Sequence, residues 1–220
     1  FQAWFVSHQA DFSLEPQTLG LASADASFRR YFRLTWPDGG TRILMDAPPE
    51  REDCKPFIHV AGLLAKAGLA APRVLDQDLE NGFLLLTDLG RIGYLDALNA
   101  DLGLADTLMR PVLDVLIAWQ LATRASTLPP YDATLLRREL ELFPEWYIGA
   151  HRQVTIEPAM RKTLDDTFAL LIQNNLSWPS VYVHRDFMPR NLMVPDDLAV
   201  PGQTDPRYLG VLDFQDAVYG

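Results

Sequence analysis

The chain has 220 residues, 48% of them hydrophobic and 22% charged, a profile typical of a soluble globular protein with room for one large domain or two lobes. Its formal net charge is -10 and no basic stripe is visible, so we expect no nucleic-acid partner. The single cysteine, Cys54, excludes a disulfide framework within the chain and predicts a reducing, cytoplasmic location.

We expect no membrane partner either. The longest apolar run, residues 112–122, is too short for a membrane span and contains Asp114 and Gln120, so it predicts a buried helix. The chain begins with Phe1 rather than Met and has no signal-peptide pattern, so we expect its extreme N-terminus to be missing.

The first part of the chain predicts a small sheet with one helix. Residues 53–67 have helical spacing with apolar side chains on one side, and Gly68 stands where that helix is expected to end. Strands are predicted at residues 17–21, 30–36, 41–45, 73–75 and 83–86. Turns are predicted at residues 23–27, 37–40 and 80–82, the second of them closing a β-hairpin.

A break at residues 87–90 marks the predicted boundary between a first lobe, residues 1–89, and a second lobe, residues 90–220. The second lobe is predicted to be mainly helical before short strands near its end. Its helices are expected at residues 94–99, 104–126, 135–150 and 158–174, with an irregularity at Pro111. This order of elements predicts an α+β chain in two lobes.

The most informative segment carries His184, Asp186 and Asn191 in the spacing H-x-D-x-x-x-x-N, between two apolar runs. A second strand-like run follows and ends at Asp213. Two aspartates and an asparagine, delivered by short strands and a loop, are the groups that metal-assisted phosphoryl transfer requires. The plainer alternative is a core histidine with a surface aspartate and a capping asparagine in a hairpin turn.

These residue types suggest separate roles. Asp186 is predicted to be the catalytic base or the group that orients the acceptor hydroxyl. Asn191 and Asp213 are predicted to hold Mg²⁺, because hard cations prefer oxygen ligands. We expect His184 to order the loop rather than to take part in the chemistry.

On four landmarks the chain resembles the aminoglycoside-phosphotransferase-like kinases. They are the small-residue loop and following strand at 23–33, the Leu-Leu-Leu-Thr-Asp-Leu-Gly hinge at 84–90, the 184–191 segment and Asp-Phe-Gln at 213–215. Within that group, the strings at 25–33 and 43–49 are similar to those of bacterial anomeric kinases, which phosphorylate the 1-hydroxyl of N-acetylmuramate and N-acetylglucosamine in peptidoglycan recycling.

This resemblance implies a bilobal protein-kinase-like fold with a small β-rich N-lobe and a mainly helical C-lobe, the latter incomplete in this chain. It also implies ATP and Mg²⁺ as cofactors and an amino sugar as substrate. The loop with Ser23, Asp25, Ser27 and Phe28 would lie over the nucleotide phosphates. Backbone groups of Thr87, Asp88 and Leu89 would meet the adenine edge.

One departure from the family pattern concerns a lysine. The third strand of the first lobe normally supplies a phosphate-binding lysine, but the first lysine of this chain is Lys55. Arg30, Arg33 or Arg42 could supply the cation instead, although a forked guanidinium is not equivalent to an ammonium. Because Asp186, Asn191 and Asp213 are retained, we favour a phosphate-binding site rebuilt around another cation over a catalytically silent protein.

The acceptor site is expected in the helical lobe. Glu145 and Trp146 belong to a stretch that mixes carboxylates with aromatic rings, as sugar-binding surfaces do, although an ordinary amphipathic helix has the same pattern. Arg190 could face a phosphate, a sugar carboxylate or solvent, and Asp216 could reach the acceptor.

Three competing functions remain open. A protein kinase is disfavoured, because Met188 replaces the lysine expected two residues after the catalytic aspartate and Gln215 replaces the glycine of Asp-Phe-Gly. Aminoglycoside phosphorylation would require a markedly acidic acceptor pocket. A nucleotide-binding pseudokinase is supported by the missing lysine alone. The pattern carries no indication of oligomeric state.

Overall fold

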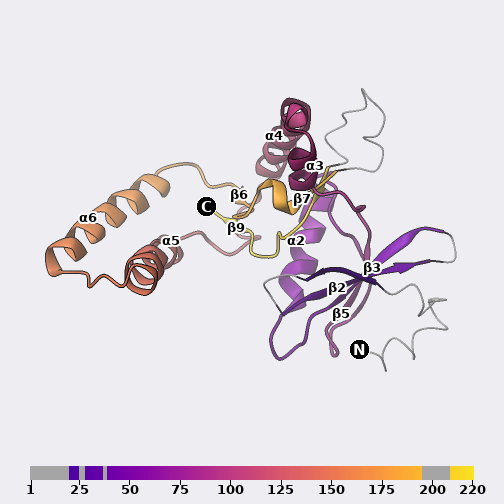
Figure 1. The fold of residues 1–220 in the computed structure, drawn as a ribbon, viewed down its shortest axis with the longest axis horizontal. Coiled ribbons are helices and arrows are strands. Elements are labelled where there is room, and N and C mark those ends of the chain that lie inside the picture. Colours follow the sequence, from indigo (N-terminus) through magenta and orange to yellow (C-terminus); the bar gives the residue numbers. More distant parts are fainter. Residues whose placement is uncertain (1–19, 25–27, 37–38, 195–208) are drawn as a thin grey trace. The chain divides into compact units, whose positions relative to one another are not determined.

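The computed structural model describes residues 20–24, 28–36, 39–194 and 209–220 (Figure 1). The chain forms two compact units: unit 1 comprises Phe1–Trp119 and Arg185–Asp216, and unit 2 comprises Gln120–His184 and Ala217–Gly220. The predicted lobe boundary after residue 89 lies inside unit 1, so the two units differ from the predicted lobes. That boundary stays a prediction.

Unit 1 contains a five-stranded antiparallel sheet in the order β1-β2-β3-β5-β4 (Figure 1). The central strands meet in register, with Leu44 of β3 beside Phe32 of β2 on one side and Leu85 of β5 on the other. The strands span Gly20–Ala24 (β1), Arg30–Thr35 (β2), Thr41–Asp46 (β3), Val74–Asp78 (β4) and Phe83–Thr87 (β5).

The predicted small-residue turn at 23–27 is partly wrong. Ser23 and Ala24 belong to β1, where they pair with Tyr31 and Arg30 of β2, because the antiparallel ladder continues through these small residues. Asp25 and Ser27 lie outside the described residues. Of the strand predicted at 17–21, residues 17–19 also lie outside the described part of the chain.

Helix α2 (Cys54–Lys66) packs its apolar face within unit 1 (Figure 1). Asp53 caps its N-terminus, since the Asp53 side chain accepts a hydrogen bond from the Lys55 amide at 2.9 Å. After the helix, Gly68 takes a φ of +75°, which glycine adopts without the strain of a side chain. The buried side chains of α2 are Cys54, Phe57, Val60, Ala61 and Leu64.

Two further helices and several short elements complete unit 1. Helix α4 ends at Leu121 and not at Ser126 as predicted, because the Thr123 amide turns back to the Gln120 carbonyl and Ser126 has a left-handed φ of +62°. The elements are α3 (Tyr94–Ala100), the 3-10 turn η2 (Leu102–Leu104), α4 (Ala105–Leu121, which contains Pro111), the 3-10 turn η4 (Pro189–Asn191), β7 (Leu192–Met193) and β8 (Gly210–Val211).

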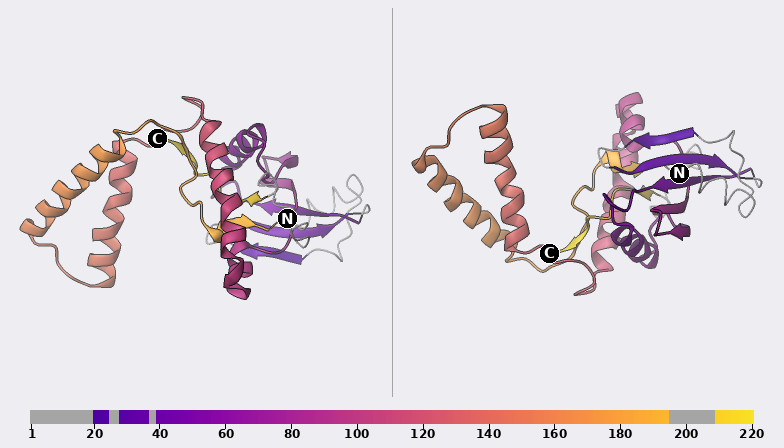
Figure 2. Two further views of the ribbon diagram at one scale, coloured as in Figure 1. Left: turned by 90° about the horizontal axis from the view of Figure 1, so that it is seen from above. Right: turned by 90° about the horizontal axis from the view of Figure 1, so that it is seen from below.

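Unit 2 is built on a helical hairpin of α5 (Ala133–Leu142) and α6 (Pro158–Asn175), which lie side by side in Figure 2. The single helix predicted at 135–150 is wrong in its second half. Residues Phe143–His151 form a π-helix, η3. Pro144 has no amide hydrogen for the regular ladder, and the last bonds reach five residues back, as from the Arg152 amide to the Tyr147 carbonyl.

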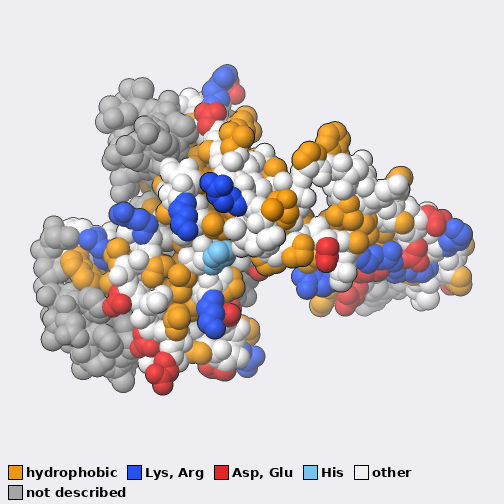
Figure 3. Space-filling model, turned by 180° about the vertical axis from the view of Figure 1, so that it is seen from behind, with side chains coloured by type: hydrophobic (Ala, Val, Ile, Leu, Met, Phe, Trp, Pro, Cys, Tyr) orange, Lys and Arg blue, Asp and Glu red, His pale blue; other side chains and the backbone are white. Residues whose placement is uncertain are grey.

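Charged side chains of both signs alternate on this hairpin (Figure 3). Arg137 of α5 and Arg161 of α6 each contact both Glu141 and Asp165, which joins the two helices. Two short strands, β6 (Tyr182–Val183) and β9 (Val218–Tyr219), pair as an antiparallel ribbon in unit 2. No helix in the described part of the chain is both long and apolar enough to cross a bilayer.

Candidate active site

Strands β7 and β8 bring the two predicted metal ligands together. Asn191 directly precedes β7, and Asp213 is the second residue after β8. The Leu212 amide donates to the Asn191 carbonyl at 2.9 Å. The strands approach closely at Gly210, where an added Cβ would lie 2.9 Å from the Cβ of Met193. A side chain at Gly210 would therefore force these strands apart.

The Asn191 amide joins the catalytic segment to Asp213. Its Nδ2 donates to the backbone carbonyl of Asp186 at 2.9 Å and to Oδ2 of Asp213 at 3.2 Å. Both contacts use the amide nitrogen, so the amide oxygen is the atom that could face a cation. The Asp186 side chain is exposed, as an acceptor-activating carboxylate must be.

Asp213 is held in an uncommon backbone conformation. Its φ is +59°, and Arg185, beside Asp186, has a φ of +76°. Non-glycine residues take this left-handed region at a cost of about 1–3 kcal/mol, and they persist there where neighbours over-determine the geometry. Four non-glycine residues in the described part of the chain have a positive φ, and two of them, Arg185 and Asp213, lie in the candidate site.

The donor set fits a Mg²⁺ ion that shares its coordination with a nucleotide. Among the described residues there is no group of three or more His, Cys, Asp or Glu side chains that could hold a metal by themselves. Mg²⁺ is commonly bound by one or two protein oxygens together with phosphates and water. The Asp213 carboxylate and the Asn191 amide oxygen are ligands of that kind. Their roles as ligands remain predictions.

Phe28 and Arg29, which directly precede β2, contact the segment before α2. The Phe28 amide donates to Oε1 of Glu52 at 3.1 Å, and Arg29 forms an ion pair with Oε2 of Glu52 at 2.9 Å. Both side chains of that pair are nearly buried, 10% exposed for Arg29 and 13% for Glu52. The Arg51 guanidinium lies over the Phe28 ring at 4.9 Å. We call these four residues, Phe28, Arg29, Arg51 and Glu52, the Glu52 latch.

The three candidate cations occupy different positions. Arg30 is the first residue of β2, opposite Asp46 at the end of β3, and forms an ion pair with it. The Asp46 side chain is 5% exposed whereas that of Arg30 is 56% exposed. Arg30 is thus a half-exposed guanidinium held by a buried carboxylate, next to the loop that was expected to cover the phosphates.

Arg33 and Arg42 are engaged elsewhere. The Arg33 guanidinium donates to both oxygens of Asp88, at 2.5 and 3.0 Å, and to the Gly90 carbonyl at 2.6 Å. Arg42 pairs in register with Thr87, at the opposite end of β3 from Asp46, and its guanidinium lies 5.8 Å from the Trp36 ring.

The hinge residues make contacts of their own within unit 1. Burial alone would raise the pKa of Asp88, but hydrogen bonds from Arg33, Thr41 and the Gly90 amide hold it below its ordinary value. The Thr87 hydroxyl accepts from the Arg73 amide at 2.9 Å. Leu89 is half-buried, and its Cδ1 lies 3.0 Å from where a Cβ on Gly210 would stand. Asp88 therefore anchors the hinge through its side chain.

The predicted acceptor residues divide between the units. Arg190 and Asp216 belong to unit 1, where the Asp216 side chain contacts the Gln215 amide at 3.3 Å and lies 4.0 Å from Arg185. Glu145 and Trp146 lie in η3 of unit 2, and both are exposed. Two of the four thus lie in the same unit as Asp213.

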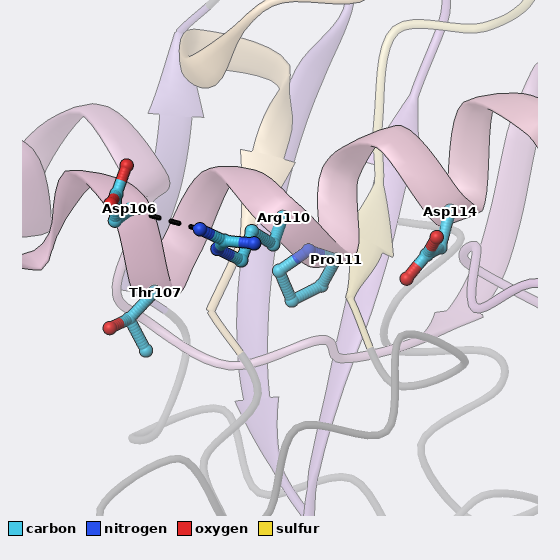
Figure 4. Close-up of a pocket in the computed structure, with 5 residues that line it drawn as sticks. All are labelled: Asp106, Thr107, Arg110, Pro111 and Asp114. Carbon is cyan, nitrogen blue, oxygen red and sulfur yellow. Dashed lines mark ion pairs between the residues drawn. The ribbon is translucent and has the colours of Figure 1, made fainter.

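A shallow depression on α4 contains none of the predicted site residues (Figure 4). It follows one face of a single helix, and the Asp106 and Arg110 side chains across it are 4.0 Å apart and almost fully exposed. We assign it no functional role. Its lining residues are Asp106, Thr107, Arg110, Pro111 and Asp114.

Three residues of the candidate site, Asp46, Arg29 and Glu52, were not predicted from the sequence, and Gln215 was noted only as a departure from a glycine. Asp46 could have been found: a hairpin closed at 37–40 with Thr35 opposite Thr41 places Arg30 opposite Asp46. Glu52 had no such signal, because 24 residues separate it from Phe28 and no ladder relates them.

Comparisons with known proteins identify the family to which the chain belongs. Residues 18–220 match the family described as "Phosphotransferase enzyme family". The chain is 53% identical over 207 residues to the N-acetylmuramate/N-acetylglucosamine kinase of Pseudomonas aeruginosa, covering 93% of the chain and 57% of that protein. The protein of the same name from Neisseria meningitidis is 39% identical over 206 residues, covering 92% and 58%. The chain thus spans somewhat more than half the length of these curated relatives.

Solved structures share the fold at low sequence identity. ADP-bound aminoglycoside phosphotransferase APH(2'')-Ib superposes with a TM-score of 0.65 at 15% identity, covering 100% of this chain and 72% of that one. Macrolide 2'-phosphotransferase MphH from Brachybacterium faecium gives 0.63 at 18% identity, with 100% and 73% coverage. The predicted α+β, protein-kinase-like fold is confirmed. The chain belongs to the phosphotransferase enzyme family.

Proposed function

We propose that the protein is an ATP-dependent kinase that phosphorylates an amino sugar, N-acetylmuramate or N-acetylglucosamine, at its anomeric 1-hydroxyl, in peptidoglycan recycling. The observation that carries this proposal is the Asn191 amide, which joins the Asp186 segment to Asp213 through bonds of 2.9 and 3.2 Å. This arrangement is one that phosphoryl transfer can use. The choice of sugar is supported by the names of the relatives, and the 1-position by the sequence resemblance.

In this proposal each side chain has one task. Asp186 would accept the proton of the acceptor hydroxyl or orient that hydroxyl toward the γ-phosphate. Asn191 and Asp213 would hold Mg²⁺, which supplies positive charge to the phosphate oxygens when bound. Arg30, held by Asp46, would contact the nucleotide phosphates in place of the missing lysine. A cytoplasmic location belongs to the same proposal.

The proposal is tested by measuring ADP release with ATP, Mg²⁺ and a panel of acceptors. We expect turnover with N-acetylmuramate or N-acetylglucosamine and none with aminoglycosides such as gentamicin. Turnover on none of the amino sugars tested would contradict the proposal. In that case, turnover on an aminoglycoside would point to the second kinase class, and nucleotide binding without any turnover would point to a pseudokinase.

A further inference from the structure

We propose that Gln215 is a positioning residue, which holds the Asp213 carboxylate in its metal-binding orientation before metal and nucleotide arrive. This inference rests on the proposed function. Protein kinases carry glycine two residues after the metal-binding aspartate, and a glycine has no side chain to contact that carboxylate. Here that position is Gln215, and its side-chain amide donates a hydrogen bond to the Asp213 carboxylate.

Gln215 joins two carboxylates. Its Nε2 donates to Oδ1 of Asp213 at 2.9 Å and lies 3.3 Å from Oδ2 of Asp216. The amide nitrogen thus places its two hydrogens between two negative charges three residues apart in sequence. Such a donor offsets the repulsion between the carboxylates and keeps both near the same side of the turn.

The Asp213 side chain is held from both sides. Oδ1 accepts from Gln215, and Oδ2 accepts from Asn191 at 3.2 Å. The next residue, Phe214, is 1% exposed, and its ring packs against that of Phe57 in α2 with centroids 4.8 Å apart. Together these contacts fix both the backbone and the carboxylate of Asp213.

An oriented carboxylate binds a metal more tightly than one that must first be ordered. Hydrogen bonds from outer residues that orient a metal ligand typically change metal affinity or activity by 10–100-fold when removed. Gln215 supplies one of the two side-chain donors seen on Asp213 among the described residues. We therefore expect its loss to weaken metal binding while the nucleotide site itself stays intact.

The test is metal binding by the purified protein with ADP, using Mn²⁺ as a spectroscopic probe in place of Mg²⁺. Gln215→Leu keeps the bulk of the side chain but removes the donor, and we expect the Kd for Mn²⁺, read by electron paramagnetic resonance, to rise about tenfold. Calorimetric ADP affinity at saturating metal should be unchanged. Gln77→Leu, at an exposed position on β4, is the matched control and should bind Mn²⁺ like the wild type.

Gln215→Asn is the second variant, in case Gln215→Leu does not fold. Its side chain is one methylene shorter and cannot reach both carboxylates, so it should also bind Mn²⁺ more weakly than the wild type. Equal Mn²⁺ affinity in the folded Gln215 variants and the wild type would overturn the inference and leave the proposed kinase function standing. A wild-type protein that bound neither Mn²⁺ nor ADP would overturn the proposed function itself.

Discussion

Asp186 is the residue on which the proposed chemistry depends most. Its carboxylate is exposed, while its backbone carbonyl is bonded to Asn191. Asp186→Ala should therefore remove the base without disturbing the metal ligands, and we expect kcat to fall by about 10²–10⁴-fold with ADP affinity roughly unchanged. Steady-state kinetics and calorimetry measure the two quantities. Asp76→Ala, on the exposed strand β4, is the control, and activity that survived Asp186→Ala would show the base assignment to be wrong.

We propose Arg30, rather than Arg42, as the cation that contacts the nucleotide phosphates. Arg30→Met removes the charge next to the β1–β2 connection, so we expect kcat/KM for ATP to fall at least tenfold. Arg42→Met, at the far end of β3, should change it much less. The ATP dependence of the rate is the measurement. The Arg30 assignment fails if Arg42→Met has the larger effect or if neither variant has any.

The Glu52 latch connects two elements and not two isolated residues. It ties the two residues before β2 to the segment that leads into α2, so it should fix the start of β2, where Arg30 lies. Glu52→Ala leaves the nearly buried Arg29 guanidinium without this partner, which should cost about 1–3 kcal/mol of unfolding free energy. We also expect the KM for ATP to rise several-fold.

Glu50→Ala is the control for the latch, because Glu50 is exposed two residues away. Denaturant unfolding measures the stability change and kinetics measure the KM. A Glu52→Ala protein with wild-type stability and wild-type KM for ATP would show that the latch has neither role.

The charge network of the α5–α6 hairpin predicts a pH dependence. Arg161, followed by Arg137, lowers the pKa of Glu141 from 4.5 to about 2, against the opposing effect of burial. Because the folded-state pKa lies below the unfolded one, the stabilisation is present above about pH 4.5 and is lost as the pH falls toward 2. These side chains are about one-third exposed, so the effect is a modest one, screened by salt.

We therefore expect the thermal midpoint to fall less steeply between pH 5 and pH 3 in Glu141→Gln than in the wild type. Circular dichroism melts at low ionic strength measure this difference, and 1 M salt should reduce it. Glu157→Gln, at an exposed glutamate before α6, is the control. Identical pH profiles for Glu141→Gln and the wild type would contradict the assigned role of the network.

At the scale of elements, the sequence predicted most where structure is local. The β2–β3 hairpin follows from alternation and a tight turn, and helix α2 follows from its apolar periodicity and from Gly68 after its end. The π-helix could not be predicted in this way. Pro144 is visible in the sequence, but no pattern of side chains indicates that the backbone hydrogen bonds shift to carbonyls five residues back.

The candidate site shows the same division. Asn191 and Asp213 could be grouped from the sequence, because each lies within two residues of a short strand-like run. The Arg33–Asp88 pair could not, since 55 residues and a helix separate the partners. Contacts of this length depend on how α2 and the strands pack, which periodicity does not encode.

At the scale of the whole molecule, the sequence relatives and the proteins that share the fold are named for different acceptors. The relatives at 39% and 53% identity bear the name of an amino sugar kinase, while two structures that share the fold, at 15% and 18% identity, are named as aminoglycoside and macrolide phosphotransferases. The acceptor therefore has to be established by experiment on the protein itself, because the fold alone accommodates several acceptors.

The most direct test of the central claim is ³¹P NMR of the product formed from ATP, Mg²⁺ and N-acetylmuramate or N-acetylglucosamine. We predict a new sugar-phosphate resonance coupled to the anomeric proton, together with ADP, and neither signal above background with Asp186→Ala. A phosphate coupled to another sugar proton would contradict the 1-position. The absence of any sugar phosphate would contradict the assignment as an amino sugar kinase.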